Sequence, residues 1–200
     1  MKNNKGMLVV LSGPAGVGKG TICRALLAQA ADLEYSVSVT TRGCRPGENE
    51  GKEYYFRTKE EFQKMIENQE LLEWAEFCGN YYGTPKFHVE KALNNNKTVL
   101  LEIDIQGAKQ VKKMYPDGVF IFIVPPSLKI LSERLYGRGT ETEDIIQLRL
   151  AKALEELEEI KDYNYIVEND YIHAAVEKIK CIITAERCST SRYPLKIKEE

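Results

Sequence analysis

The chain has 200 residues, of which 43% are hydrophobic, so it is long enough for one sizeable core and short for two ordinary domains with a linker. Its 28 basic and 30 acidic residues leave a net charge of -2, so no overall basic field attracts nucleic acid or an anionic membrane. No apolar stretch approaches the roughly 18 residues of a membrane span, and the N-terminal segment lacks an apolar secretory region. We therefore expect one cytoplasmic domain, a monomer or homodimer, that binds neither nucleic acid nor membrane.

Apolar runs and helical patterns alternate along the chain. The run 7–11 ends in Ser-Gly, and residues 21–31 then show helical spacing of apolar side chains. Later apolar runs cover 98–103, 119–124 and 165–167, and helical patterns cover 109–114, 128–135, 144–161 and 172–184. This alternation is typical of buried parallel strands joined by crossover helices.

Residues 37–90 have a different pattern. Valines alternate with polar residues near the start, an aromatic run covers 54–56, and one helix is predicted from about residue 60 to 74. We interpret this segment as a small mixed-sheet insertion. A second interruption, within 134–150, is poor in apolar residues and contains glycines, which predicts a mobile lid. The core then consists of about residues 1–36, 91–133 and 151–200.

A glycine-rich segment with a lysine joins the first strand to the first helix. This context is the one that a P-loop requires, because backbone N–H groups and the helix N-terminus then converge on phosphate oxygens. Lys19 would reach between the β and γ phosphates of a nucleotide. A plain glycine-rich turn is the less favoured alternative. The expected ATP-binding residues are Gly13, Pro14, Ala15, Gly16, Val17, Gly18, Lys19, Gly20 and Thr21. The predicted fold class is α/β, with a P-loop NTPase-type parallel sheet flanked by helices.

The residue after Lys19 departs from the general P-loop pattern. Gly20 stands where Ser or Thr usually meets Mg²⁺, and Thr21 follows it. The Gly-Lys-Gly-Thr form resembles the loops of nucleoside monophosphate kinases, in which the metal depends more on water and phosphate oxygens. We therefore assign no metal role to Gly20 and assign Thr21 to nucleotide phosphate.

Several ordered motifs point to a particular acceptor. They are Ser36-Val-Ser-Val-Thr-Thr-Arg-Gly-Cys-Arg-Pro-Gly-Glu, Gly51-Lys-Glu-Tyr-Tyr-Phe, Glu73-Trp-Ala-Glu-Phe-Cys-Gly-Asn-Tyr-Tyr-Gly-Thr, Glu102-Ile-Asp-Ile-Gln-Gly, Pro125-Pro-Ser and Arg134-Leu-Tyr-Gly-Arg-Gly-Thr-Glu-Thr-Glu. Together they closely resemble the guanylate kinases, over about residues 6–190. The resemblance implies transfer of the γ-phosphoryl group of ATP to GMP, and also to dGMP, with Mg²⁺ accompanying ATP. It makes the insertion, about residues 37–90, a GMP-binding domain.

The resemblance also implies roles for single residues. Arg42, Arg45, Tyr54 and Tyr82 would hold the GMP phosphate; Glu73 would accept hydrogen bonds from the guanine edge; Ser38 and Thr84 would supply hydroxyls near O6 and N7. Lys19, Arg134, Arg138 and Arg149 would converge on the transferring phosphoryl group. Asp104, interpreted as ending a buried strand as a Walker B carboxylate does, would hold the GMP ribose or phosphate region and position Mg²⁺ through water.

Without the resemblance, other interpretations stay open. Each tyrosine is then more simply a packed aromatic, Glu73 a solvated charge at a helix end, and Arg149 an ion-pair partner on a helix surface. A kinase of a ribose phosphate and a non-catalytic interaction module are the competing functions. Where an Asn is expected directly after the last apolar run, Glu168 stands first and Asn169 follows, which leaves the adenine contact and the preference for ATP open.

Overall fold

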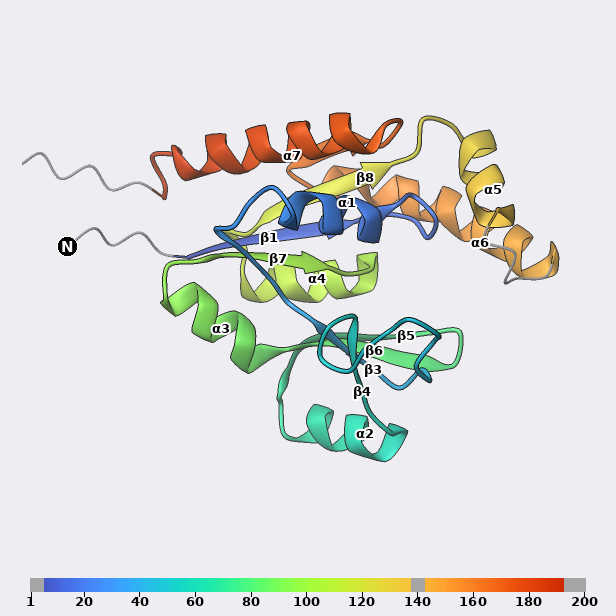
Figure 1. Ribbon diagram of the computed structural model, residues 1–200, viewed down its shortest axis with the longest axis horizontal. Coiled ribbons are helices and arrows are strands. Elements are labelled where there is room, and N and C mark those ends of the chain that lie inside the picture. Colours follow the sequence, from blue (N-terminus) through green and yellow to red (C-terminus); the bar gives the residue numbers. More distant parts are fainter. Residues whose placement is uncertain (1–5, 138–142, 193–200) are drawn as a thin grey trace, which may run out of the picture.

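The central layer is a sheet of five parallel strands (Figure 1). The computed structural model describes residues 6–137 and 143–192. The strand order is β2 (Leu33–Tyr35), β7 (Thr98–Glu102), β1 (Met7–Ser12), β8 (Val119–Val124) and β9 (Tyr165–Glu168). All four neighbouring pairs are parallel. The sheet confirms the expected fold class.

Every residue of β1 is buried, and successive side chains enter different cores. Val9 and Leu11 pack with one hydrophobic cluster, whereas Leu8 and Val10 pack with another. A strand alternates its side chains between two faces, so a run that is apolar at every position needs cover on both sides.

Helices supply that cover. On one face lie α1 (Lys19–Leu27) and α7 (Ile172–Arg187), and on the other lie α3 (Lys86–Asn94) and α4 (Ile105–Met114) (Figure 1). Beyond the carboxyl end of β8 come α5 (Leu128–Tyr136), α6 (Glu143–Leu157) and the short 3₁₀ helix η1 (Glu158–Asp162). No helix within the described ranges is long and apolar enough to cross a membrane.

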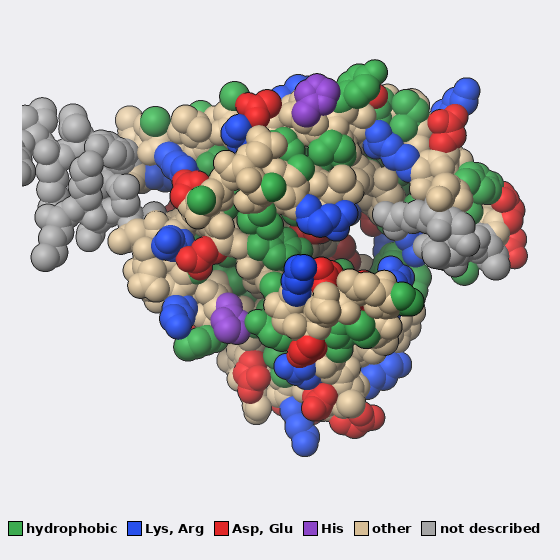
Figure 2. Space-filling view, viewed as in Figure 1, with side chains coloured by type: hydrophobic (Ala, Val, Ile, Leu, Met, Phe, Trp, Pro, Cys, Tyr) green, Lys and Arg blue, Asp and Glu red, His purple; other side chains and the backbone are tan. Residues whose placement is uncertain are grey.

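The second sheet is mixed and has the order β4 (Tyr54–Phe56), β3 (Ser38–Thr40), β6 (Asn80–Pro85) and β5 (Leu71–Phe77). Its β3–β4 pair is parallel, while the two pairs made by β6 are antiparallel. One side is covered by α2 (Lys59–Glu67), whose fully buried Phe62 stacks on Tyr81. Figure 2 shows the molecule hollowed between this insertion and the core, with acidic and basic side chains around the hollow.

The prediction of one helix from about residue 60 to 74 is wrong. The helix α2 ends at Glu67, Gln69 takes a positive φ of 56°, and β5 begins at Leu71. Residues 73 to 76 alternate between buried and exposed side chains, which is the period of a strand. Glu73 is therefore a buried residue within strand β5 and not a charge at the end of a helix.

The prediction that Asp104 ends a strand is also wrong. Strand β7 ends at Glu102, and Asp104 is the N-cap of α4, where its Oδ1 accepts a hydrogen bond of 2.8 Å from the Gly107 N–H. An Asp at this position satisfies one of the free N–H groups of the first helical turn.

Candidate active site

The loop between β1 and α1 has the backbone that phosphate binding requires. Gly13 has a φ of 142°, and a Cβ there would lie 2.3 Å from the Ile123 carbonyl oxygen, so only glycine fits. Gly18 is the N-cap of α1, has a φ of 94° and supplies no capping side chain. The first N–H groups of α1 therefore have no side-chain cap and can bind an anion.

Lys19 lies across its own loop. Its Nζ donates hydrogen bonds to the carbonyl oxygens of Gly13, at 2.5 Å, and Pro14, at 3.1 Å. Burial lowers the pKa of Lys19, while the negative charges of Glu102, Glu156 and Asp104 act in the opposite direction. The ammonium is thus held at the phosphate loop by carbonyl oxygens that a nucleotide phosphate can replace.

Asn169 joins the phosphate loop to the end of β9. Its Nδ2 donates a 2.6 Å hydrogen bond to the Val17 carbonyl oxygen, and Arg134 Nη2 donates a 2.9 Å bond to the Asn169 carbonyl oxygen. Glu168 is the exposed last residue of β9, so Asn169 directly follows the strand. In the sequence Asn169 stands one position after the end of the apolar run, because the strand continues one residue beyond that run. A contact between Asn169 and adenine stays a prediction.

A buried carboxylate lies between the two sheets. Glu73 is 4% exposed and faces Thr84 across the β5–β6 pair, and Thr84 Oγ1 donates a 2.6 Å hydrogen bond to Glu73 Oε1. The other oxygen, Oε2, lies 2.2 Å from where a Cβ on Gly107 would be, so the first turn of α4 leaves room for the carboxylate only because it carries a glycine there. Ser38 is 9% exposed at the start of β3.

Burial, with a smaller contribution from the Asp104 charge, raises the pKa of Glu73 from 4.5 to about 7 against the opposing effect of the Thr84 hydrogen bonds. Since the unfolded chain ionises Glu73 at a lower pH than the folded protein does, folded stability decreases as pH rises from 4.5 to about 7. This pKa interval corresponds to about 3 kcal/mol. The ligand-free protein carries this cost at and above neutral pH.

We expect Glu73→Gln to raise the free energy of unfolding of the ligand-free protein by about 2 kcal/mol at pH 8, because the neutral amide removes the cost of a buried charge but still needs partners. The gain should be smaller at pH 5, where Glu73 is protonated in the folded parent. Urea unfolding of both proteins at the two pH values measures the difference. An equal difference at pH 5 and pH 8 would contradict the raised pKa.

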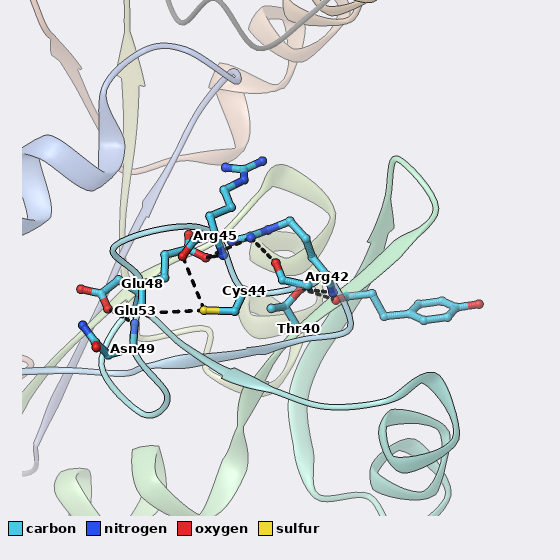
Figure 3. A network of polar contacts seen from close by, with 9 residues as sticks. Thr40, Arg42, Cys44, Arg45, Glu48, Asn49 and Glu53 are labelled. Carbon is cyan, nitrogen blue, oxygen red and sulfur yellow. Dashed lines mark hydrogen bonds and ion pairs between the residues drawn. The ribbon is translucent and has the colours of Figure 1, made fainter.

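The predicted phosphate-binding residues cluster around β3. Arg42 donates two hydrogen bonds to the Glu48 carboxylate, at 3.0 and 2.8 Å (Figure 3), and it also lies over the Tyr54 ring, 5.3 Å from the ring centroid. The Tyr54 and Tyr82 rings meet edge to face at 6.1 Å. Burial raises the pKa of Tyr54 to about 12, so its hydroxyl is a hydrogen-bond donor at neutral pH.

Glu48 organises the turn that carries both arginines. Besides holding the Arg42 guanidinium, its Oε2 accepts a 2.9 Å hydrogen bond from the Arg45 N–H (Figure 3). The Arg42 hydrogen bonds lower the pKa of Glu48, which therefore stays charged. The exposed Arg45 side chain extends away from the Glu48 carboxylate in Figure 3. One guanidinium is thus fixed and the other is exposed for an incoming anion.

The predicted arginines of the lid lie in different surroundings. Arg134 is on α5 and bonds the backbone at Asn169, whereas Arg149 is on α6 and lies over the Phe77 ring, 5.2 Å from its centroid. Arg138 lies outside the described residues. Among the residues that the structure does describe, no group of three His, Cys, Asp or Glu side chains could hold a metal ion.

Three residues of this region lie inside the quoted motifs, but no role for them is predicted from the sequence. Glu48 holds Arg42, Gly107 leaves the space that the Glu73 carboxylate occupies, and Phe77 contacts Arg149, which is 72 positions away. An acidic residue six positions after an arginine in a turn is a signal that could have indicated Glu48. The other two depend on how the sheets meet.

Comparison with known proteins identifies the family. The model of the guanylate kinase family matches residues 5–186. The guanylate kinase of Desulfitobacterium hafniense is 58% identical over 194 residues, covering 97% of each chain, and that of Shouchella clausii is 56% identical over 199 residues, covering 100% of this chain and 97% of the relative. A crystal structure of guanylate kinase from Anaplasma phagocytophilum superposes with a TM-score of 0.82 at 36% identity, covering 97% of this chain and 93% of that one. By sequence along almost its whole length and by fold, the chain belongs to the guanylate kinase family.

Proposed function

We propose that this protein transfers the γ-phosphoryl group of ATP to GMP, giving ADP and GDP, and that dGMP is a second acceptor. The observation that carries the proposal is the buried Glu73 carboxylate, held by Thr84 on the insertion that faces the phosphate loop. Guanine presents two adjacent donors, N1–H and the 2-amino group, which the two oxygens of one carboxylate accept. Adenine presents an acceptor at N1, which a carboxylate repels.

The phosphate of GMP would meet Arg42, Arg45 and the hydroxyls of Tyr54 and Tyr82. The two hydrogen bonds between Arg42 and Glu48 support this assignment. They fix one edge of the guanidinium, so its remaining N–H donors point in a defined direction. Ser38 and Thr84 would complete the base site, and Asp104, which neighbours Glu73 electrostatically, would contact the nucleoside.

Phosphoryl transfer mainly requires positioning and neutralisation of charge, since the acceptor phosphate is already a nucleophile at pH 7. Gly13 to Thr21 would hold the phosphates of ATP, with Lys19 at the β and γ oxygens. Arg134, Arg149 and Arg138, the last of which is outside the described residues, would stabilise the transferring group and exclude water on closure.

Mg²⁺ would accompany ATP and neutralise charge on its phosphate oxygens. The described residues offer no three-carboxylate site for such an ion, but Asp104 supplies a hard oxygen donor of the kind that Mg²⁺ prefers and acts electrostatically on the Lys19 ammonium at the phosphate loop. We assign Asp104 a contact through water. Mg²⁺ keeps several waters in most nucleotide sites and needs only one or two carboxylates.

A coupled assay with ATP, Mg²⁺ and each of GMP, dGMP, AMP, CMP and UMP tests the proposal. We expect turnover with GMP and dGMP and almost none with the other three, because only guanine offers the paired donors. GMP binding without turnover would contradict the kinase assignment in favour of an interaction module. Turnover with AMP at a comparable rate would contradict the role of Glu73.

A further inference from the structure

The turn between β5 and β6 directs an aromatic ring toward α6. Phe77 is the last residue of β5 and pairs with Asn80 across the two-residue turn Cys78-Gly79. The two turn residues have φ values of 50° and 73°, the signs found in the tight type I′ hairpin turn. The hairpin tip therefore holds Phe77 in a defined place.

Two cations of α6 lie against that ring. Arg149 Cζ is 5.2 Å and Lys152 Nζ is 5.0 Å from the ring centroid, within the range of a cation–π interaction. The two residues are three positions apart, so they share one side of the helix. The insertion and α6 thus contact each other through one aromatic residue and two cations.

We propose that Phe77 is a positioning residue that orients the Arg149 guanidinium toward the transferring phosphoryl group. This inference rests on the proposed function, in which Arg149 acts in the reaction. The hairpin that carries Phe77 also carries Glu73 and Thr84, so the element that binds the acceptor base is the one that orders the arginine. Contact of the insertion with α6 then helps to place the arginine.

Such a residue affects turnover more than ground-state binding. Losing the ring leaves Glu73, Thr84 and the phosphate-binding turn in place but lets the Arg149 side chain sample other rotamers. We expect Phe77→Leu to lower kcat about tenfold, on the scale of a cation–π contact between partly buried groups, while KM for GMP changes less than twofold. Phe77→Tyr keeps the ring face and should restore most of kcat.

The chain offers a matched control. Phe87 on α3 lies under Lys91, with the Nζ 5.9 Å from the ring centroid, and is 68% exposed away from the phosphate loop. Phe87→Leu therefore removes a comparable aromatic–cation contact and should leave kcat unchanged. Calorimetric titration measures GMP binding by every variant.

A double-mutant cycle separates positioning from general packing. If Phe77 acts through Arg149, adding Phe77→Leu to Arg149→Met should cost no further kcat, whereas a structural role would cost the same factor in both backgrounds. Should Phe77→Leu not fold, Phe77→Met fills similar space without a ring face and enters the same cycle. Parent protein without GMP-dependent turnover would overturn the proposed function and this inference together. If the parent is active, an unchanged kcat in Phe77→Leu would overturn this inference alone. Additive effects of the two substitutions on kcat would do the same.

Discussion

Lys19→Ala is expected to lower kcat about a thousandfold or more, while GMP binding and the fold are preserved. The ammonium is the cation that the phosphate loop itself supplies, and within the described part of the chain it donates hydrogen bonds to the Gly13 and Pro14 carbonyl oxygens. In the reaction it would face charge that grows on the β and γ oxygens. Removing one such preorganised group typically costs a factor of about 10² to 10³ or more.

The measurement is kcat in the coupled assay with saturating ATP and GMP. Thermal unfolding and calorimetric titration check the fold and GMP binding of the variant. Lys180→Met is the matched control, because Lys180 lies on α7 in a surface ion pair with Glu177 and should not affect turnover. Near-normal turnover of Lys19→Ala would show that the loop does not bind the reacting phosphates.

Segments whose structure is decided locally were predictable from the sequence. Strand β8 occupies the predicted residues 119–124, because a run that is apolar at every position cannot be exposed on either face. The phosphate loop also follows from local rules, since positive φ values at Gly16 and Gly18 and a following helix are properties of the segment itself.

The boundary between α2 and β5 was not predictable in the same way. The helical spacing of apolar residues over 60–66 predicts a helix that continues to Trp74. The alternation of buried and exposed side chains at Glu73, Trp74 and Ala75 is instead that of a strand. Gln69 allows the chain to leave the helix by taking a positive φ. A glutamine in the sequence does not predict that conformation. The burial of Glu73 then depends on contacts with Thr84 and Gly107, 11 and 34 positions away.

The buried side of α6 also differs from the side that the sequence suggests. The sequence of α6 suggests an apolar side that includes Ile145, Leu148 and Leu154, yet these are 40%, 69% and 51% exposed. The buried residues of α6 are Ile146 and Ala153. Periodicity shows that a helix is amphipathic, but only the neighbouring elements decide which side they cover. In α6 the polar neighbours Arg149 and Lys152 instead contact the insertion through Phe77.

Glu73→Gln is expected to weaken GMP binding by more than a neutral hydrogen bond, about 1.5–3 kcal/mol, and to leave ATP binding almost unchanged. The carboxylate accepts from both N1–H and the 2-amino group, whereas the Gln amide places a donor against one of them. IMP keeps N1–H but lacks the 2-amino group, so it should bind the parent weakly and lose less than GMP on the substitution. Equal losses for GMP, IMP and AMP would show that Glu73 supports the structure and does not select the base.

The pH dependence of GMP binding provides an independent test of the same carboxylate. Because Glu73 has a pKa of about 7 in the ligand-free protein and must be ionised to accept two hydrogen bonds, parent affinity for GMP should fall as pH decreases below about 7. The phosphate of GMP also gains a proton near pH 6, and that change alone should weaken binding to Glu73→Gln. Calorimetric titration with GMP from pH 5.5 to 8.5 compares the two proteins. We expect affinity to fall more steeply with decreasing pH in the parent than in Glu73→Gln, because Glu73 must release a proton before it binds the base. Parallel plots of affinity against pH would mean that the bound base does not require the charged carboxylate.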